Sequence, residues 1–329
     1  MYNGPAGIAG MGVYVPEKIL TNSELEKIVD TSDEWIRTRT GIVERRVVEG
    51  DTATSDLAVP AAKAALEDAG VHIDEVDLIL VAASTPDMIF PSTACLVQKK
   101  LNSKGAAAFD LQAACTGFVY GLTVASQFIE TGMYKTVLFI GADAFTRHIN
   151  WKDRGTCILF GDGAGAFVLR RAEKGYGLLS SYLAADGSGA DLLKIPAGGS
   201  CHPGSEQSIK EGLHYVYMNG SEVFKFAVRV FPEAVQKALD KAGLTVDDID
   251  YLVPHQANIR IINSGAERLG ISKEKVVVNL DRYGNTSTAS IPLALYDLYK
   301  TGSLKRGDVL VFVGYGAGLT WGANVVRWY

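Results

Sequence analysis

Several features that would mark other classes of protein are scarce in this sequence. Its 329 residues include only four cysteines and ten prolines. Four cysteines in a chain of this length cannot form a dense disulfide framework, and no Cys-x-x-Cys or Cys/His pair has the spacing of metal ligands. We therefore expect a reducing, cytoplasmic setting and no bound metal.

The sequence also lacks an excess of basic residues and a long apolar run. Its formal net charge of −5 argues against a nucleic-acid partner, although a local basic patch could still bind an acidic protein. The apolar runs are either as short as strands or interrupted by polar residues, whereas a membrane span needs about 20 apolar residues. We expect no membrane association.

Glycine and apolar residues, in contrast, are abundant. The chain contains 35 glycines, and 47% of its residues are hydrophobic. That composition is enough for a sizeable core, and an excess of glycine over proline suits tight turns between strands and helices. Helix-like and strand-like segments alternate along the chain, which predicts an α/β fold with a largely parallel sheet packed between helices.

Parts of the chain repeat one another. Residues 65–70 (ALEDAG) resemble residues 238–243 (ALDKAG) at an offset of 173, and each reads as a helix end closed by glycine before an apolar strand. Two Thr-Gly helix ends, at 131–132 and 301–302, form a second pair at an offset of 170. Matches that keep their order at nearly one spacing predict a duplicated fold.

The duplication divides the chain into two halves, roughly 1–171 and 172–329, which a pseudo-twofold axis would relate. Residues 276–280 read as a strand of the second half. The stretch from 186 to 220 breaks the pattern because it is rich in Gly, Ser and Pro. It is too long for a simple turn, and loops of this length are usually functional or mobile.

Cys115 is the strongest candidate for chemistry. It lies between a strand-like segment and the apolar helix predicted at 119–129. The positive end of a helix dipole favours a thiolate at this position, and the small neighbouring residues leave room for a substrate. A buried structural cysteine is the alternative, and Cys95 in a helix and Cys157 in an apolar strand are interpreted in that way.

Two further residues are placed like Cys115, at the ends of predicted strands. The offset of 170 relates Cys115 to Asn285, and duplication would bring their two strand-to-helix turns together across the pseudo-twofold axis. His255 follows the strand predicted at 251–254, and open α/β sheets bind ligands beyond such strand ends. A capping or core histidine is the alternative for His255.

A series of short motifs carries a resemblance to a known family. The motifs are TSDEWI (31–36), RTGI (39–42), ACTG (114–117), DRGT (153–156), FGDGAG (160–165), PHQAN (254–258), YGNTS (283–287) and GAGLTWG (316–322). In this order, the chain resembles β-ketoacyl-acyl carrier protein synthase III, the initiating condensing enzyme of dissociated fatty acid synthesis. The resemblance implies a thiolase-like α/β/α/β/α layered fold and an acyltransferase that performs a decarboxylative Claisen condensation.

The resemblance also assigns a role to each catalytic residue. It implies a triad of Cys115, His255 and Asn285, and an oxyanion hole formed by the backbone N–H groups of Cys115 and Ala317. Ala317 stands where the family has a glycine. A backbone donor survives that change if φ stays negative, so we expect activity to be retained.

The substrates and partners implied by the resemblance are acyl-CoA, an acyl carrier protein and a second copy of the chain. Trp35 and Arg154 would sandwich the coenzyme A adenine, and the other residues of that channel are Thr31, Arg39 and Asn258. The acyl pocket would be lined by Phe160, Met218 and Tyr315, and by Phe90 from the partner subunit of a homodimer. The carrier-docking residues would be Lys225, Arg260 and Arg268. No cofactor is expected, because acyl-CoA is a substrate.

Several related functions share parts of this pattern. A thiolase would usually have a second catalytic cysteine near the C-terminal Gly-rich loop, but no cysteine follows Cys201. A hydroxymethylglutaryl-CoA-type synthase needs a glutamate base, for which no position matches. A non-catalytic carrier-binding protein would be expected to lose Cys115. A starter-unit synthase of a secondary-metabolite pathway shares the whole triad and stays open as the alternative.

Overall fold

Two main β-sheets form the framework of the computed structural model, which describes residues 4–329. The first sheet has the strand order β1-β7-β6-β4-β5, and the second has the order β11-β12-β13-β8. The strands of the first sheet are β1 (Ala6–Tyr14), β4 (Leu78–Ala82), β5 (Ala107–Leu111), β6 (Thr136–Asp143) and β7 (Gly163–Arg171). Those of the second are β8 (Gly177–Ala185), β11 (Tyr251–Pro254), β12 (Val309–Gly316) and β13 (Thr320–Arg327). Two short pairs lie outside these sheets: β2 (Ile19–Thr21) with β3 (Glu44–Arg46), and β9 (Leu193–Lys194) with β10 (Tyr217–Met218).

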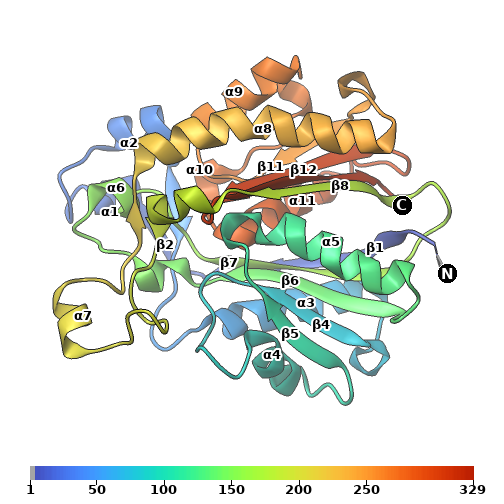
Figure 1. Ribbon diagram of the computed structural model, residues 1–329, viewed down its shortest axis with the longest axis horizontal. Helices are drawn as coiled ribbons and strands as arrows, with labels where there is room; N and C mark the ends of the chain where they lie inside the picture. Colours follow the sequence, from blue (N-terminus) through green and yellow to red (C-terminus); the bar gives the residue numbers. More distant parts are fainter. Residues whose placement is uncertain (1–3) are drawn as a thin grey trace.

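Helices form three layers around the two sheets (Figure 1). The central helices α5 and α11 lie between the sheets, and α5 contacts strands of both. Helices α3 and α4 cover the outer face of the first sheet, while α8 covers the outer face of the second and packs against α9. The long helices are α3 (Thr54–Ala69), α4 (Thr93–Leu101), α5 (Gly117–Glu130), α8 (Gly220–Ala242), α9 (Ile259–Leu269) and α11 (Ser290–Lys300). The short ones are α1 (Asn22–Leu25), α2 (Asp33–Thr40), α6 (Arg154–Cys157), α7 (Glu206–Lys210) and α10 (Leu280–Tyr283). This arrangement is the predicted α/β/α/β/α layered fold. The prediction of a largely parallel sheet is wrong, because β7 and β13 pair antiparallel with both of their neighbours.

The topology contains the predicted duplication. Strands β4 and β11 begin 173 residues apart, and so do β6 and β12. Each half also has an N-terminal strand that pairs antiparallel with its last strand, β1 with β7 and β8 with β13. The carboxylate of Asp77 accepts the N–H of Thr136, and Asp250 repeats this contact with Val309. Equivalent elements therefore build the two sheets.

The predicted equivalence of Cys115 and Asn285 is wrong. Ala114 and Ser287, which are 173 residues apart, both have positive φ angles, of 47° and 51°. This alignment makes Thr288 the counterpart of Cys115. Helix α11 has 11 residues, whereas its counterpart α5 has 14, so the ends of the two helices are 170 residues apart. The loop after α11 is longer by the same amount, which returns the spacing to 173 at β12. The two turns do contact each other, as expected.

Three local expectations differ from the structure. The stretch 186–220 is not irregular throughout, because it contains β9, α7 and β10. Residues 276–280 contribute a single bridge to β11, and α10 begins at the last of them. Cys157 is buried, as expected, but it ends helix α6 rather than lying in a strand, because Asp153 caps the start of that helix.

Candidate active site

Cys115 lies deep in the molecule, in the 3-10 turn η2 (Ala114–Thr116) that leads directly into α5. It is only 6% exposed, yet it lines two cavities that meet at its side chain. Its place before α5 matches the prediction. Burial, however, raises the pKa of the Cys115 thiol to about 12, because a charge is disfavoured where water is excluded. Burial therefore disfavours the thiolate that a position before α5 was expected to favour.

His255 and Asn285 line one of these cavities together with Cys115. His255 follows β11 and is buried, and its Nδ1 lies 2.6 Å from the hydroxyl oxygen of Ser290. Burial lowers the pKa of His255 to about 3, so the ring is neutral near pH 7. Ser290 lies outside the motifs found in the sequence and begins α11, three residues after the YGNTS motif.

Asn285 is held by its backbone and by one side-chain oxygen. Its N–H donates to the carbonyl of Leu159 at 2.8 Å, and its carbonyl accepts the N–H of Gly161 at 3.0 Å. The side-chain Oδ1 accepts the N–H of Ser287 at 2.9 Å. Within residues 4–329 the Nδ2 group has no hydrogen-bond partner, so the amide presents a donor to the cavity.

Cys115 and Ala317 meet on the other side of the thiol, where both line the larger cavity. Gly316, at the end of β12, approaches so closely that a Cβ atom built on it would lie 2.8 Å from the Cys115 nitrogen. A side chain at position 316 would therefore displace η2. Ala317 keeps a negative φ, which is the condition for its N–H to replace that of the family glycine.

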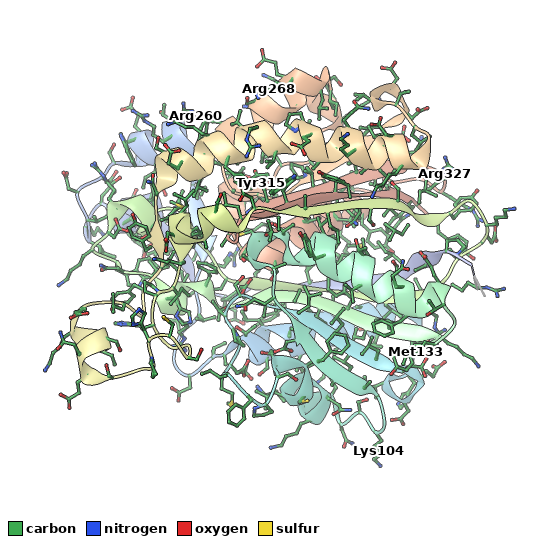
Figure 2. The ribbon with its side chains drawn as sticks, in the orientation of Figure 1. Lys104, Met133, Arg260, Arg268, Tyr315 and Arg327 are labelled. Carbon is green, nitrogen blue, oxygen red and sulfur yellow. The ribbon has the colours of Figure 1, made fainter. Side chains whose placement is uncertain are left out.

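The two cavities share Cys115 and Leu193 and differ in size, at about 370 and 90 Å³. Three of the residues predicted for the acyl pocket line the smaller cavity: Phe160, Met218 and Tyr315. None of the predicted residues lines the larger cavity. Figure 2 shows Tyr315 in the interior of the C-terminal half. The larger cavity is lined by apolar residues that the sequence analysis did not name, which include Phe145, Ile195 and Val216.

A pair of stacked rings stands between the cavities. Phe145 faces the larger one and Phe160 the smaller one, and their ring centroids are 4.3 Å apart with an interplanar angle of 16°. Phe90 lines neither cavity within this single chain. It is 82% exposed and, with its neighbours in 88–90, forms an apolar surface.

The predicted coenzyme A residues gather between α2, α6 and α9. The Arg154 guanidinium lies 4.9 Å from the centre of the Trp35 ring, and that of Arg39 lies 5.9 Å from it. Asn258 caps α9 and donates its side-chain amide to the carbonyl of Arg39 at 3.1 Å. Thr31 precedes α2 and has a buried hydroxyl without a partner in residues 4–329. The Arg154 guanidinium is thus within cation–π distance of the Trp35 ring.

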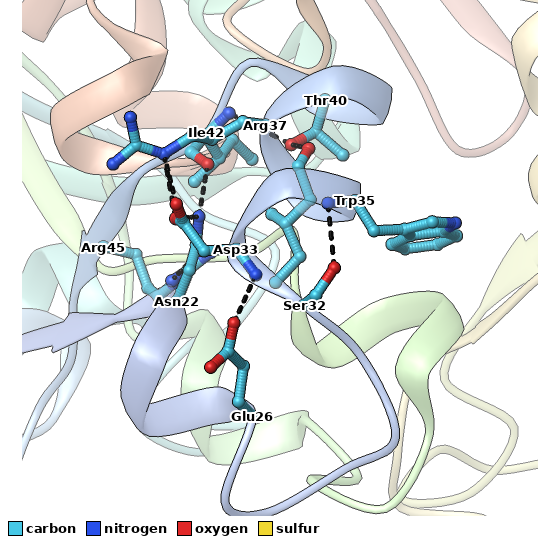
Figure 3. Close-up of polar contacts among 10 residues, drawn as sticks. Asn22, Glu26, Ser32, Asp33, Trp35, Arg37, Thr40, Ile42 and Arg45 are labelled. Carbon is cyan, nitrogen blue, oxygen red and sulfur yellow. Dashed lines mark hydrogen bonds and ion pairs between the residues drawn. The ribbon is translucent and has the colours of Figure 1, made fainter.

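A buried polar network, which the sequence analysis did not predict, supports the helix that carries Trp35 (Figure 3). The side chain of Asn22 donates to Asp33 at 2.9 Å and accepts two hydrogen bonds from Arg45. Arg45 is fully buried and also donates to the carbonyl of Ile158 at 2.8 Å. It therefore connects α2 to the segment that pairs with Asn285.

The predicted carrier-docking residues are exposed on α8 and α9. Figure 2 shows Arg260 and Arg268 along this outer edge. The Arg260 guanidinium lies 5.3 Å from the ring centre of Phe224, which lines the smaller cavity. Arg268 donates to the carbonyl of Val228 at 3.1 Å, and Lys225 forms an ion pair within α8. Arg260 is therefore a neighbour of a residue in the cavity wall.

Two family profiles match the chain. That of 3-oxoacyl-[acyl-carrier-protein] synthase III covers residues 109–187, and that of its C-terminal part covers residues 239–328. The β-ketoacyl-[acyl-carrier-protein] synthase III of Caldanaerobacter subterraneus subsp. tengcongensis is 57% identical over 323 residues, which are 98% of each chain. The chain belongs to the β-ketoacyl-[acyl-carrier-protein] synthase III family.

Solved structures of synthase III proteins agree with this assignment. The crystal structure of 3-oxoacyl-[acyl-carrier-protein] synthase III from Aquifex aeolicus has a TM-score of 0.91 and 49% identity, and covers 98% of this chain and 100% of its own. The priming β-ketosynthase of a polyketide biosynthetic pathway has a TM-score of 0.92 but only 34% identity, over 99% of this chain and 97% of its own. The sequence identities favour synthase III over the starter-unit alternative.

Two other kinds of feature are absent from residues 4–329. Across residues 4–329, no helix has the length and apolar character that a membrane crossing requires. The same residues contain no group of three or more His, Cys, Asp or Glu side chains able to hold a metal ion.

Proposed function

We propose that this protein transfers a short acyl group from acyl-CoA to Cys115 and condenses it with malonyl-acyl carrier protein, the step that initiates fatty acid synthesis. The observation that carries the proposal is the convergence of Cys115, His255 and Asn285 on one buried cavity. A nucleophile, a neutral histidine and an amide donor are the groups that acyl transfer and decarboxylation require. The high identity to named synthase III proteins supports the same activity.

In the first half-reaction the Cys115 sulfur attacks the thioester carbon of acyl-CoA. The new S–C bond forms as the bond to the coenzyme A sulfur breaks, and the thiol proton ends on that departing sulfur. The N–H groups of Cys115 and Ala317 stabilise the oxyanion of the tetrahedral intermediate, an effect often worth several kcal/mol. The covalent acyl-enzyme divides one difficult condensation into two easier steps.

In the second half-reaction malonyl-acyl carrier protein loses CO₂, and its thioester oxygen gains negative charge. When Ser290 donates to Nδ1 of His255, the ring proton resides on Nε2. That Nε2–H and the Nδ2 group of Asn285 both donate to the enolate oxygen. The carbanion then attacks the acyl carbon, the bond to Cys115 breaks with its electrons on sulfur, and a 3-ketoacyl carrier protein leaves. The Cys115 thiolate takes up a proton from water, which restores the thiol. No step requires a cofactor.

A panel of acyl-CoA primers tests this proposal. Each primer is incubated with the protein and either malonyl-acyl carrier protein or malonyl-CoA, and the 3-ketoacyl product is measured. We expect short primers to be used and the carrier-bound malonyl group to be strongly preferred. A protein that is acylated but condenses only with malonyl-CoA would instead belong to a starter-unit pathway.

The proposed carrier surface predicts the effect of reversing one charge. Acyl carrier proteins are acidic, so Arg260→Glu is expected to raise the KM for malonyl-acyl carrier protein several-fold and leave the KM for acyl-CoA unchanged. The control is Lys104→Glu, a charge reversal at the opposite edge of the molecule (Figure 2), which should change neither constant. Equal increases in both KM values for Arg260→Glu would reject the docking surface.

The exposed surface at 88–90 predicts both the assembly and the primer length. We propose that the protein is a homodimer in which Phe90 closes the acyl pocket of the partner. Phe90→Ala should then shift kcat/KM toward longer primers, by about 1–3 kcal/mol of discrimination per methylene. The control is Met133→Ala, which truncates another exposed apolar side chain. An unchanged primer profile in a Phe90→Ala protein that light scattering shows to be dimeric would remove Phe90 from the pocket.

A further inference from the structure

Arg45 is a buried cation whose hydrogen bonds, among residues 4–329, all end on uncharged oxygens. It lies in the middle of β3 and is 0% exposed. Its two terminal nitrogens donate to the carbonyls of Leu20 and Ile158, at 3.0 and 2.8 Å, and to the Oδ1 of Asn22 at 2.9 Å. Its Nε has no partner in the same residues. A buried charge without an oppositely charged partner costs free energy, so fold stability alone is a weak reason for this residue.

Arg45 holds the segment of chain against which Asn285 is paired. One of the carbonyls that accept from Arg45 immediately precedes the segment 159–161, to which Asn285 makes two backbone hydrogen bonds, of 2.8 and 3.0 Å. A Cβ atom built on Gly161 would lie 3.1 Å from the Cβ of Arg45, and one built on Gly284 would lie 3.2 Å from it. The stem of Arg45 therefore packs against both segments of the pair that presents the Asn285 amide to the cavity.

Arg45 also holds helix α2, through Asn22 (Figure 3). Asn22 donates its amide to the Asp33 carboxylate at 2.9 Å and to the Ile42 carbonyl at 2.8 Å. Asp33 is the first residue of α2, and Ile42 lies two residues beyond its last. Trp35, which is proposed to bind the coenzyme A adenine, lies on this helix. Arg45 and Asn22 thus fix α2 at both of its ends.

We propose that Arg45 is a positioning residue, which fixes the Asn285 amide in the cavity through the segment 158–161 and keeps helix α2 in a constant relation to it. The inference rests on the proposed function, in which Asn285 donates to the enolate oxygen during decarboxylation. A catalytic donor has to be held within about 0.5 Å, and a displacement of about 1 Å can cost roughly 10²-fold in rate. A rigid guanidinium fork that binds three oxygens provides such a support, whereas the single nitrogen of a lysine does not.

Replacing Arg45 with lysine separates this role from simple structural support. Arg45→Lys keeps the charge and loses the fork, so decarboxylation of malonyl-acyl carrier protein should fall about tenfold or more. Acylation of Cys115 at saturating acetyl-CoA should be unchanged, because Asn285 takes no part in that step. The KM for acetyl-CoA should rise several-fold, because α2 is no longer held. Release of labelled CO₂ measures decarboxylation, and mass spectrometry measures acylation.

Two further variants divide the role and control for the substitution. Asn22→Asp keeps an oxygen for Arg45 but places a negative charge beside Asp33. It should therefore raise the KM for acetyl-CoA and leave decarboxylation unchanged, since malonyl-acyl carrier protein has no adenine to bind on α2. The matched control is Arg46→Lys, the same substitution at the next residue of β3, which donates to the Pro16 carbonyl at 3.3 Å. It should change neither half-reaction.

A merely structural role for Arg45 would lower both half-reactions by the same factor, because only the folded fraction of the protein reacts. That result, or an unchanged rate of decarboxylation in Arg45→Lys, overturns the proposal. Slower decarboxylation in Asn22→Asp also overturns it, because α2 rather than Arg45 would then support Asn285. Arg45→Gln, which removes the buried charge, replaces the lysine variant if circular dichroism shows that variant to be unfolded, and the same split is expected. Failure of the unchanged protein to decarboxylate malonyl-acyl carrier protein would instead reject the proposed function, and with it the basis of this inference.

Discussion

Replacing Cys115 with alanine is expected to abolish acyl transfer, lowering kcat roughly 10⁴- to 10⁶-fold. None of the other three cysteines can substitute for it. Cys157 is buried at the end of α6, Cys201 is exposed, and Cys95 lies in α4, and none of the three lines a cavity with His255 and Asn285. Incubation with radiolabelled acetyl-CoA, followed by peptide mapping, measures the acyl-enzyme directly.

The label should appear on the peptide that contains Cys115 and be absent from Cys115→Ala. Cys201→Ala is the matched control, because it removes the exposed thiol and should leave labelling and turnover unchanged. Label on Cys157 or Cys201 in the unchanged protein would show that the nucleophile is wrongly assigned.

Replacing His255 or Asn285 with alanine is expected to reduce decarboxylation by about 10²- to 10³-fold each, the usual effect of losing one donor to a developing oxyanion. Acylation of Cys115 should fall much less, because neither side chain contacts the first oxyanion in the proposed mechanism. Acylation is measured by mass spectrometry, and decarboxylation by release of labelled CO₂ from malonyl-acyl carrier protein. Condensation at a near-normal rate by either variant would contradict the mechanism.

The pH dependence of the second half-reaction provides a separate check on His255. Burial lowers its pKa to about 3, so lowering the pH from 8 to 5 should leave the ring neutral and its contribution to decarboxylation intact. The unfolded chain binds a proton at His255 near pH 6.5, and the folded protein does not. This group therefore makes the fold less stable as the pH falls from about 6.5 toward 3, and its contribution is constant above that window.

The local elements of this fold could be read from the sequence. Gly70 and Gly243 end α3 and α8 in the left-handed conformation, as the repeated helix ends predicted. Cys115 stands directly before α5, and His255 directly after β11, where the patterns placed them. These features depend on periodicity and turn chemistry over a few residues, which a sequence displays directly.

The grouping of the triad came from family motifs and not from the repeat. The offset of 170 is that between the ends of α5 and α11, which differ in length, so it does not apply to residues before these helices, and Thr288 is the true counterpart of Cys115. Sequence symmetry therefore located the two facing turns but not the register between them. When two related helices differ in length by three residues, matching their ends in the sequence does not show where along the chain the difference arises.

The sequence by itself determined the layered α/β architecture, the duplication and the residues from which a condensing site would be built. Only the tertiary structure decided the protonation of that site and its division into two cavities. Burial gives Cys115 a high pKa and His255 a low one, and the stacked Phe145 and Phe160 separate the cavities. These properties depend on how completely both halves exclude water from their shared centre. The exclusion of water is determined jointly by side chains that are more than a hundred residues apart in the chain.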